Sequence, residues 1–225
     1  MKKLIILLCL IFIPALTASD TSTYVLAVSG QDAGGMSGNS DDFTGSQAAL
    51  ATHDANWTAS ADGVANFEID GSGHLRLTGN YKSASAYYDA STSDVSQVVV
   101  PAGSTNGYFR PRVCVRMSDS VRGYCFGLID NDGTNWGDIA VYKDGGVLCY
   151  LEGTYSASSN HTIKIVASGT STVTLNAYVD GSEVTSGCTD SSSPYESGHP
   201  GVMMHGSSAA DYANNLMDDW QDYED

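Results

Sequence analysis

Two arginines, Arg112 and Arg116, are the side chains of this chain best placed to do chemistry. They flank Cys114 in the strand-like segment FRPRVCVRM, and residues two apart lie on the same face of a β-strand. Their guanidinium groups could hold sugar hydroxyls or the carboxylate of a uronic acid. The alternative is that each arginine pairs with one of the many aspartates of the chain.

Aromatic side chains offer a second way to hold a sugar, because a ring can stack on the apolar face of a pyranose. Trp136 and Tyr155 lie in segments that read as loops, and we take both as ligand-binding candidates. Trp57 and Trp220 are expected in the core. A Trp136 ring that caps the end of the domain is the alternative.

Two predicted β-hairpins position these residues. The first turns at Asp119 and Ser120, and its expected pairs are Met117 with Arg122, Val115 with Tyr124, Cys114 with Cys125, and Val113 with Phe126. The second turns at Asp144-Gly145, and its expected pairs are Val141 with Leu148, Ala140 with Cys149, and Ile139 with Tyr150. In both, the alternation separates a core face from a surface face, with Met117 in the core and Arg112 and Arg116 at the surface.

The rest of the chain reads as short strands rich in Val, Ile, Leu, Thr and Tyr, separated by Gly, Asp, Asn and Ser, with no helix. Asp70-Gly71 and Asp180-Gly181 predict further tight turns, because each supplies positive φ between apolar runs. This pattern predicts an all-β fold, a two-sheet antiparallel β-sandwich. Strands are expected at 65–69, 74–78, 84–89, 95–100, 108–117, 122–129, 138–143, 147–152, 161–167, 172–179, 183–185, 202–205 and 215–220.

The N-terminus has the pattern of a secretory signal peptide: Lys2 and Lys3, then an apolar run, then small residues up to Ser19. We expect a signal peptide at 1–18, a short strand and Gly/Ser-rich connector at 19–40, and one domain at 41–225. The apolar run is too short to span a bilayer, and no second one follows, so membrane insertion is not expected. The net charge of −16 argues against nucleic acid and anionic membranes as partners.

The cysteines fit an exported protein. Beyond the N-terminal segment the chain has an even number of them, which predicts disulfides: Cys114, Cys125, Cys149 and Cys188. The first hairpin sets Cys114 opposite Cys125, which leaves Cys149 for Cys188. A metal site is the alternative, but no C-x-x-C occurs and no histidine is near the four in sequence.

The order of these segments resembles the concanavalin A-like lectin and glucanase superfamily, especially its laminin G-like jelly rolls. The resemblance covers residues 41–220. It rests on Asp41-Asp42-Phe43, Trp57, FEIDGSGHLRLTG, GYFRPRVCVRM, GYCFGLIDNDG, IAVYKDGGVLCYL, TLNAYVDGSEVTSGCTD, GHPGVMM and LMDDW. It implies two sheets packed face to face, with a ligand on the concave side of one sheet or in the loops at its rim.

The resemblance also implies a place for a structural calcium, since the superfamily's first and last strands are neighbours and several members bind calcium near them. Asp42 and Asp219, next to Asp41 and Asp218, would supply the carboxylates. A loop with Asp130, Asp132, Thr134 and Asp138 is the other candidate. Turn formation and solvated charge are the alternative for both, and no other cofactor is expected.

Catalysis is not expected. Laminarinase-like members of the superfamily carry Glu-x-Asp-x-x-Glu on one strand, whereas here Glu68 and Asp70 are followed by Gly71-Ser72-Gly73. The Gln-x-His signature of the polysaccharide lyases is also missing. We therefore expect a secreted, non-catalytic carbohydrate-binding or adhesion module whose partner is a polysaccharide or glycan. A polysaccharide lyase and a structural surface or matrix protein without a small ligand are the alternatives.

Overall fold

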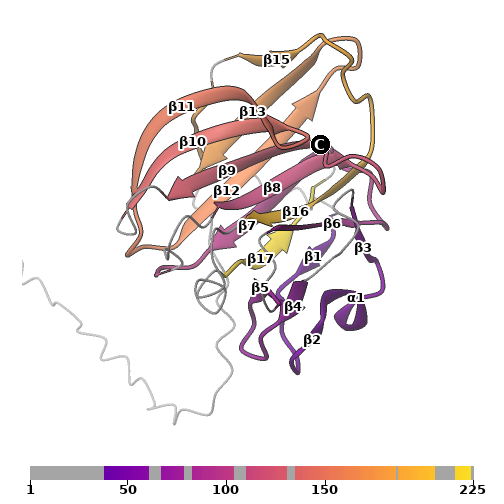
Figure 1. Ribbon diagram of the computed structural model, residues 1–225, viewed down its shortest axis with the longest axis vertical. Helices are drawn as coiled ribbons and strands as arrows, with labels where there is room; N and C mark the ends of the chain where they lie inside the picture. Colours follow the sequence, from indigo (N-terminus) through magenta and orange to yellow (C-terminus); the bar gives the residue numbers. More distant parts are fainter. Residues whose placement is uncertain are drawn as a thin grey trace, which may run out of the picture. The chain divides into compact units, whose positions relative to one another are not determined.

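The computed structural model describes residues 38–60, 67–78, 83–103, 110–130, 135–185, 187–205 and 216–223. The predicted signal peptide and nearly all of the connector lie outside these residues. Within them the strands form two large antiparallel sheets that pack face to face, and a small third sheet (Figure 1). The prediction of an all-β sandwich is confirmed.

The first sheet has the strand order β11-β10-β9-β8-β16-β6-β3. Its strands are β3 (Trp57–Ala59), β6 (Ser83–Tyr88), β8 (Arg110–Met117), β9 (Tyr124–Asp130), β10 (Asn135–Lys143), β11 (Gly146–Ser156) and β16 (His199–His205). Figure 1 shows β8 to β11 side by side, so consecutive hairpins build one half of this sheet.

The second sheet has the order β1-β17-β7-β12-β13-β14, and β15 also pairs with β13. Its strands are β1 (Ser40–Asp41), β7 (Val95–Val100), β12 (His161–Ser168), β13 (Val173–Val179), β14 (Ser182–Glu183), β15 (Cys188–Asp190) and β17 (Asp218–Gln221). Because β17 lies between β1 and β7, the first and last strands of the domain are neighbours.

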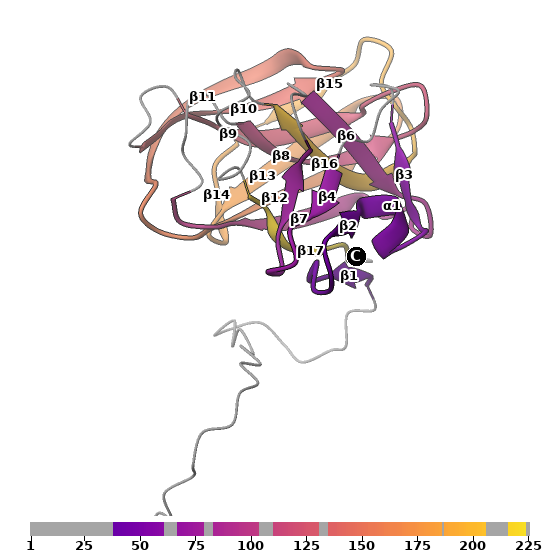
Figure 2. The ribbon, with the colours of Figure 1, turned by 60° about the horizontal axis from the view of Figure 1, so that its bottom comes forward.

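The small sheet lies near β1 and β17 (Figure 2). It contains β2 (Ala48–Ala49), β4 (Phe67–Ile69) and β5 (Leu75–Leu77), and β2 is followed along the chain by one helical turn, α1 (Leu50–His53). The sequence analysis did not predict α1, β1, β2, β3 or β15. All five are short, and a segment of two to four residues carries too little periodicity to identify.

The core lies between the two large sheets. In β13 every second residue is buried, from Val173 to Val179, as expected for a strand with one face in the core. Trp57 and Trp220 are both in the core, as predicted, with their rings 4.8 Å apart. Their indole N–H groups donate to Asp41 Oδ2 at 2.8 Å and to Ser96 Oγ at 3.0 Å, so neither polar atom is buried without a partner.

A buried carboxylate links the two sheets. Asp190 on β15 accepts hydrogen bonds from Tyr124 Oη at 2.7 Å and from Lys143 Nζ at 2.6 Å, both on the first sheet. Burial alone would raise the pKa of Asp190, but the hydrogen bonds from Lys143, Tyr124 and the Ser192 N–H lower the pKa on balance. The ionised carboxylate therefore stabilises the packing of one sheet on the other.

The first predicted hairpin is correct in its centre and turns at Asp119 and Ser120, where the Ser118 N–H donates to the Val121 carbonyl oxygen at 2.9 Å, but the predicted pair Met117 with Arg122 is not in the ladder. Cys114 lies opposite Cys125 as predicted, and the flanking pairs Val115 with Tyr124 and Val113 with Phe126 are also confirmed. Beyond Val115 the ladder ends, because Arg116 has a φ of 56° and β8 bulges there against β16. A bulge adds one residue to the strand, so the side chains after it point to the opposite face from the one predicted. Met117 therefore lies in the same apolar cluster as Cys114 and not in the core between the sheets.

The second hairpin turns at Asp144-Gly145 as predicted, with φ values of 48° and 83°. The predicted pairs are wrong by one residue, because a bulge at Leu148 in β11, opposite Val141 and Tyr142, shifts the register. The observed pairs are Val141 with Cys149, Ala140 with Tyr150, and Ile139 with Leu151. The shift sends Cys149 toward the core and Tyr150 to the surface.

The other two Asp-Gly turns differ from each other. Asp180-Gly181 is the tight turn predicted, since Val179 pairs with Ser182 across it. Asp70-Gly71 is not, because the ladder closes only at Ile69 with Leu75. Asp70 Oδ1 accepts the N–H groups of Ser72 and His74, which holds the wider loop in place.

Both predicted disulfides are present. Cys114–Cys125 joins adjacent strands of the first sheet, and Cys149–Cys188 joins the first sheet to the second. In the described part of the chain, no helix is long and apolar enough to cross a membrane.

Candidate ligand-binding site on the outer face of the first sheet

The first sheet buries side chains on both of its faces. The face that points away from the second sheet carries its own apolar cluster, separate from the core, and we call it the outer face. Its buried members are Tyr87, Cys114, Met117, Cys125, Ile129, Ala140, Tyr142 and Met203.

Arg112 lies within this apolar cluster. Its guanidinium carbon is 3.7 Å from the centroid of the Tyr142 ring, and its Nη1 is 3.5 Å from Met203 Sδ. The stem of Arg112 crosses Gly127 on β9, where a Cβ atom would come within 2.6 Å of Arg112 Cγ and 2.3 Å of the Pro111 carbonyl oxygen. Glycine at position 127 therefore leaves the space in which Arg112 lies.

Arg112 is 4% exposed, yet it has no counter-charge among the described residues. Its Nε is buried without a hydrogen-bond partner. Burial lowers the pKa of Arg112, interaction with Tyr142 partly offsets this, and the positive charges of Arg110 and Arg122 lower the pKa further. The outer face thus holds a buried cation whose described contacts are a π ring and a thioether.

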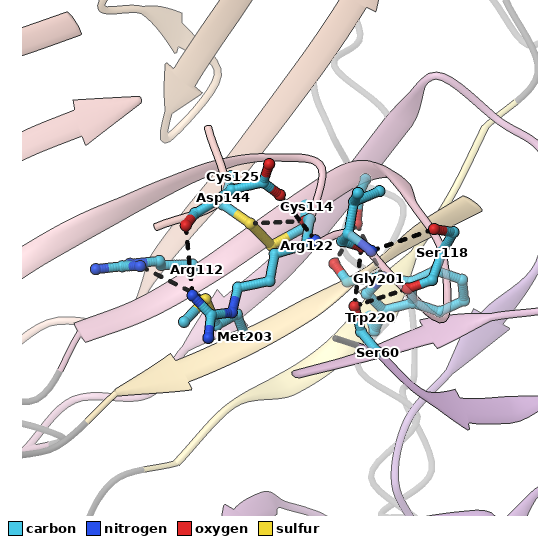
Figure 3. The surroundings of a disulfide bond; sticks show 12 residues. Ser60, Arg112, Cys114, Ser118, Arg122, Cys125, Asp144, Gly201, Met203 and Trp220 are labelled. Carbon is cyan, nitrogen blue, oxygen red and sulfur yellow. Dashed lines mark hydrogen bonds between the residues drawn. A yellow bond between two sulfur atoms is a disulfide. The ribbon is translucent and has the colours of Figure 1, made fainter. Parts of the chain in front are cut away.

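Two more guanidinium groups lie close by. Figure 3 shows Arg122 and Arg112 beside the Cys114–Cys125 disulfide, next to Met203. Arg122 Nη1 donates to the main-chain oxygen of Asp144 at 3.3 Å. Arg110 precedes Arg112 by two residues on β8, is half-buried, and has an Nε without a hydrogen-bond partner. Positive charge is therefore concentrated here in a strongly acidic chain.

An exposed aromatic residue lies in the same row of the sheet. Arg112 pairs with Gly127, Gly127 with Ala140, and Ala140 with Tyr150, whose side chain is 55% exposed. With neighbouring strands about 4.8 Å apart, this row spans roughly 14 Å. Gly127 and Ala140 are themselves buried, so the exposed member of this row is the Tyr150 ring, on which a sugar could stack.

The sequence analysis did not select Tyr150, because the predicted register paired it with Ile139 on the core face. The observed pair, Tyr150 with Ala140, depends on the bulge at Leu148 in β11. In the sequence, Tyr150 lies in the mainly apolar run VLCYL, where nothing distinguishes it from its neighbours.

Arg116 does not share the outer face with Arg112, in contrast to the prediction. It is 2% exposed and forms a bidentate pair with Asp94, with both N–O distances at 2.7 Å. Its Nη1 also donates to the carbonyl oxygens of Gly169 and Tyr195. The hydrogen bond to Asp94 raises the pKa of Arg116, so pairing with an aspartate, the alternative considered from sequence, describes this residue.

The two aromatic candidates are not part of the outer face as described. Tyr155 is half-buried, packs against the core, and has its ring edge-on to His161 with centroids 5.6 Å apart. Trp136 pairs with Tyr155 through the backbone of β10 and β11, and its side chain lies outside the described residues. Of the four predicted ligand-binding residues, Arg112 is the one that the structure places there.

The acidic candidates meet in a second place. The pairing of β1 with β17 puts Asp42 and Asp219 in the lining of one pocket of about 470 Å³, together with Asp41 and Trp220. Burial and the neighbouring Asp219 raise the pKa of Asp218 to about 6, and burial and Asp42 raise the pKa of Asp219. Across the described ranges, no three acidic, His or Cys side chains are arranged to hold a metal ion.

The other acidic candidates have different outcomes. In the loop with Asp130, Asp132, Thr134 and Asp138, all four side chains lie outside the described residues. Glu68 is paired with Arg76 at 2.7 Å on the small sheet. Asp70 accepts hydrogen bonds from the main chain of its own loop, so Glu68 and Asp70 both have structural partners.

Comparison with known proteins places the fold. No protein-family model and no curated protein sequence matches the chain. The chain is similar in structure to a Bacillus subtilis protein described as having unknown function and a galectin-like fold, with a TM-score of 0.51, 10% identity, and coverage of 82% of this chain and 93% of that one. The fold is the concanavalin A-like jelly roll that the sequence predicted.

Two further structures are similar to a lesser degree. One is a carbohydrate-binding module, CBM66, from Bacillus subtilis, with a TM-score of 0.46, 12% identity, and coverage of 76% of this chain and 92% of that one. The other is a Bacillus licheniformis β-glucanase, with a TM-score of 0.48, 13% identity, and coverage of 84% and 98%. The laminin G-like subtype stays a prediction.

Proposed function

We propose that this protein is a non-catalytic carbohydrate-binding or adhesion module that is secreted, and that its glycan lies across the outer face of the first sheet. The observation that carries the proposal is the exposed ring of Tyr150, which lies in one row of the sheet with Arg112, across the buried residues Gly127 and Ala140. An exposed ring stacks on a pyranose, and a guanidinium group donates to its hydroxyls.

The two disulfides support an extracellular location, because such bonds persist in oxidising compartments. The predicted signal peptide at 1–18 would account for export.

The test is thermal unfolding of the purified protein with a panel of neutral and acidic polysaccharides, because a ligand that prefers the folded state raises the melting temperature. We expect a saturable rise with at least one polysaccharide and no shortening of the polymer. Tyr150→Ala should weaken binding about tenfold, as expected for the loss of one aromatic contact. Tyr178→Ala is the matched control, since Tyr178 lies on the second sheet against Lys164.

Two results would reject the proposal. Release of unsaturated oligosaccharides would make the protein a polysaccharide lyase. Self-association without a shift from any polysaccharide would make it a structural surface or matrix protein.

We also propose a structural calcium at Asp42 and Asp219. Burial and, second, the charge of the exposed Asp42 raise the pKa of the half-buried Asp219, and a divalent cation held between the two carboxylates in their shared pocket would offset both effects. Calcium should then raise the melting temperature, and Asp219→Asn should abolish that rise. An unchanged melting temperature up to millimolar calcium would exclude the site.

A further inference from the structure

Several cations of the described residues have a carboxylate partner, whereas two on the outer face do not. Arg76, Arg116 and Lys143 each contact a carboxylate, at 2.7, 2.7 and 2.6 Å. Arg110 and Arg112 have no such partner among the residues described, although the chain carries 26 Asp and Glu. In so acidic a protein an unpaired surface arginine is uncommon, and an unpaired buried one is costly.

The surroundings of Arg112 are suited to exchange for an anion. The Tyr142 ring compensates part of its charge, and Met203 Sδ occupies the position of an acceptor at Nη1. A thioether is a weak acceptor on a flexible side chain, so a carboxylate or sulfate oxygen can displace it. Arg110, half-buried on the same face of β8, supplies a second guanidinium group at the approach.

We infer that the ligand of the outer face is an acidic polysaccharide, whose carboxylate or sulfate group pairs with Arg110 and Arg112 while a neighbouring sugar ring stacks on Tyr150. This inference rests on the proposed function and specifies its ligand. Guanidinium groups bind both anions in bidentate geometry. The negative charge of the whole chain repels polyanions in general, so binding depends on this local site and weakens as salt screens it.

The experiment is calorimetric titration of the purified protein with three probes: laminarin as a neutral glucan, polygalacturonate as a uronate polymer, and carrageenan as a sulfated galactan. We expect one acidic probe or both to bind at least tenfold more tightly than laminarin. Binding to polygalacturonate alone identifies a carboxylate as the anion, and binding to carrageenan alone identifies a sulfate.

Variants assign the effect to the site. Arg110→Gln and Arg112→Met should each weaken binding to the acidic probe at least tenfold. Arg76→Gln removes the same charge from the small sheet and should leave the affinity unchanged. Met203→Glu offers Arg112 a carboxylate of its own and should abolish acidic binding. Melting curves check that each variant folds. If Arg112→Met does not fold, the affinity of Arg110→Gln for the acidic probe decides the result.

The failures can be told apart. If laminarin binds as tightly as the acidic probes, the inference is wrong and carbohydrate binding stands. Equal losses from Arg110→Gln and Arg76→Gln would also overturn it, because net charge would then explain the effect. If none of the three probes binds, and the wider panel fails too, the proposed function itself is wrong.

Discussion

Arg112 and Arg116 are identical residues four positions apart on one strand, yet they have opposite roles. Arg112 lies on the outer face against Tyr142 and has no carboxylate partner among the described residues, while Arg116 pairs with Asp94. The difference comes from the positive φ of Arg116, which reverses the faces of β8 at that residue. At the residue scale, the chemistry of a side chain in this fold depends on backbone geometry that composition does not reveal.

The buried carboxylate of Asp190 gives a pH-dependent prediction. Its folded-state pKa is lowered, so its contribution to stability is present above the unfolded pKa near 3.8 and is lost as the pH falls through the folded value. Asp190→Asn should lower the free energy of unfolding by about 2–4 kcal/mol at pH 7, because it leaves Lys143 without its counter-charge. Urea titrations at pH 7 and pH 3 measure both values, and the deficit should shrink at pH 3.

Glu183→Gln is the control, since Glu183 is exposed on the short edge strand β14. It should change the free energy of unfolding by less than about 0.5 kcal/mol. A deficit for Asp190→Asn that is equal at the two pH values would contradict the assigned role of its charge.

At the scale of elements, tight turns set the register of some hairpins, and bulges shift the register of others. Gly181 has a φ of 76° and no atom within 4 Å of the position that a methyl group would take, so only backbone strain opposes a side chain there. Gly181→Ala should therefore cost about 1–2 kcal/mol of stability. Gly146→Ala, at the other Asp-Gly hairpin but without positive φ, should cost less than about 0.5 kcal/mol. Chemical denaturation compares the two, and equal costs would refute the strain argument.

The elements also show how far the sequence could predict this fold. The alternation of apolar and polar residues predicted the bounds of β7, and the hairpin register predicted that Cys114 lies opposite Cys125. Both predictions were correct because they depend on local period-two patterns. The bulges at Arg116 in β8 and at Leu148 in β11 could not be predicted, since a local period-two pattern does not indicate where a strand takes an extra residue. Those two bulges determine which face of the sheet Arg116 and Tyr150 occupy. Arg112 is therefore the one residue of the candidate site that the sequence analysis selected correctly.

At the scale of the whole molecule, Cys149–Cys188 connects the sheets and closes a loop of 39 residues, whereas Cys114–Cys125 closes one of 11. In the chain-entropy description, removing the first should cost about 4 kcal/mol and removing the second about 3 kcal/mol. Paired Cys→Ala variants, unfolded in urea without reductant, give the two values. A larger loss from the Cys114 and Cys125 pair would show that local packing, and not loop closure, dominates.

The position of β17 has a consequence for how the chain folds. Asn39 and Asp222 are 183 residues apart in sequence and joined by hydrogen bonds, and β17 separates β1 from β7 in the second sheet. Trp220, at the centre of the core, arrives with this late strand. A nascent chain therefore lacks the strand that completes its second sheet until nearly the whole domain has been synthesised. The second sheet of this jelly roll is therefore completed only when residues 218–221 are available to pair with β7 and β1.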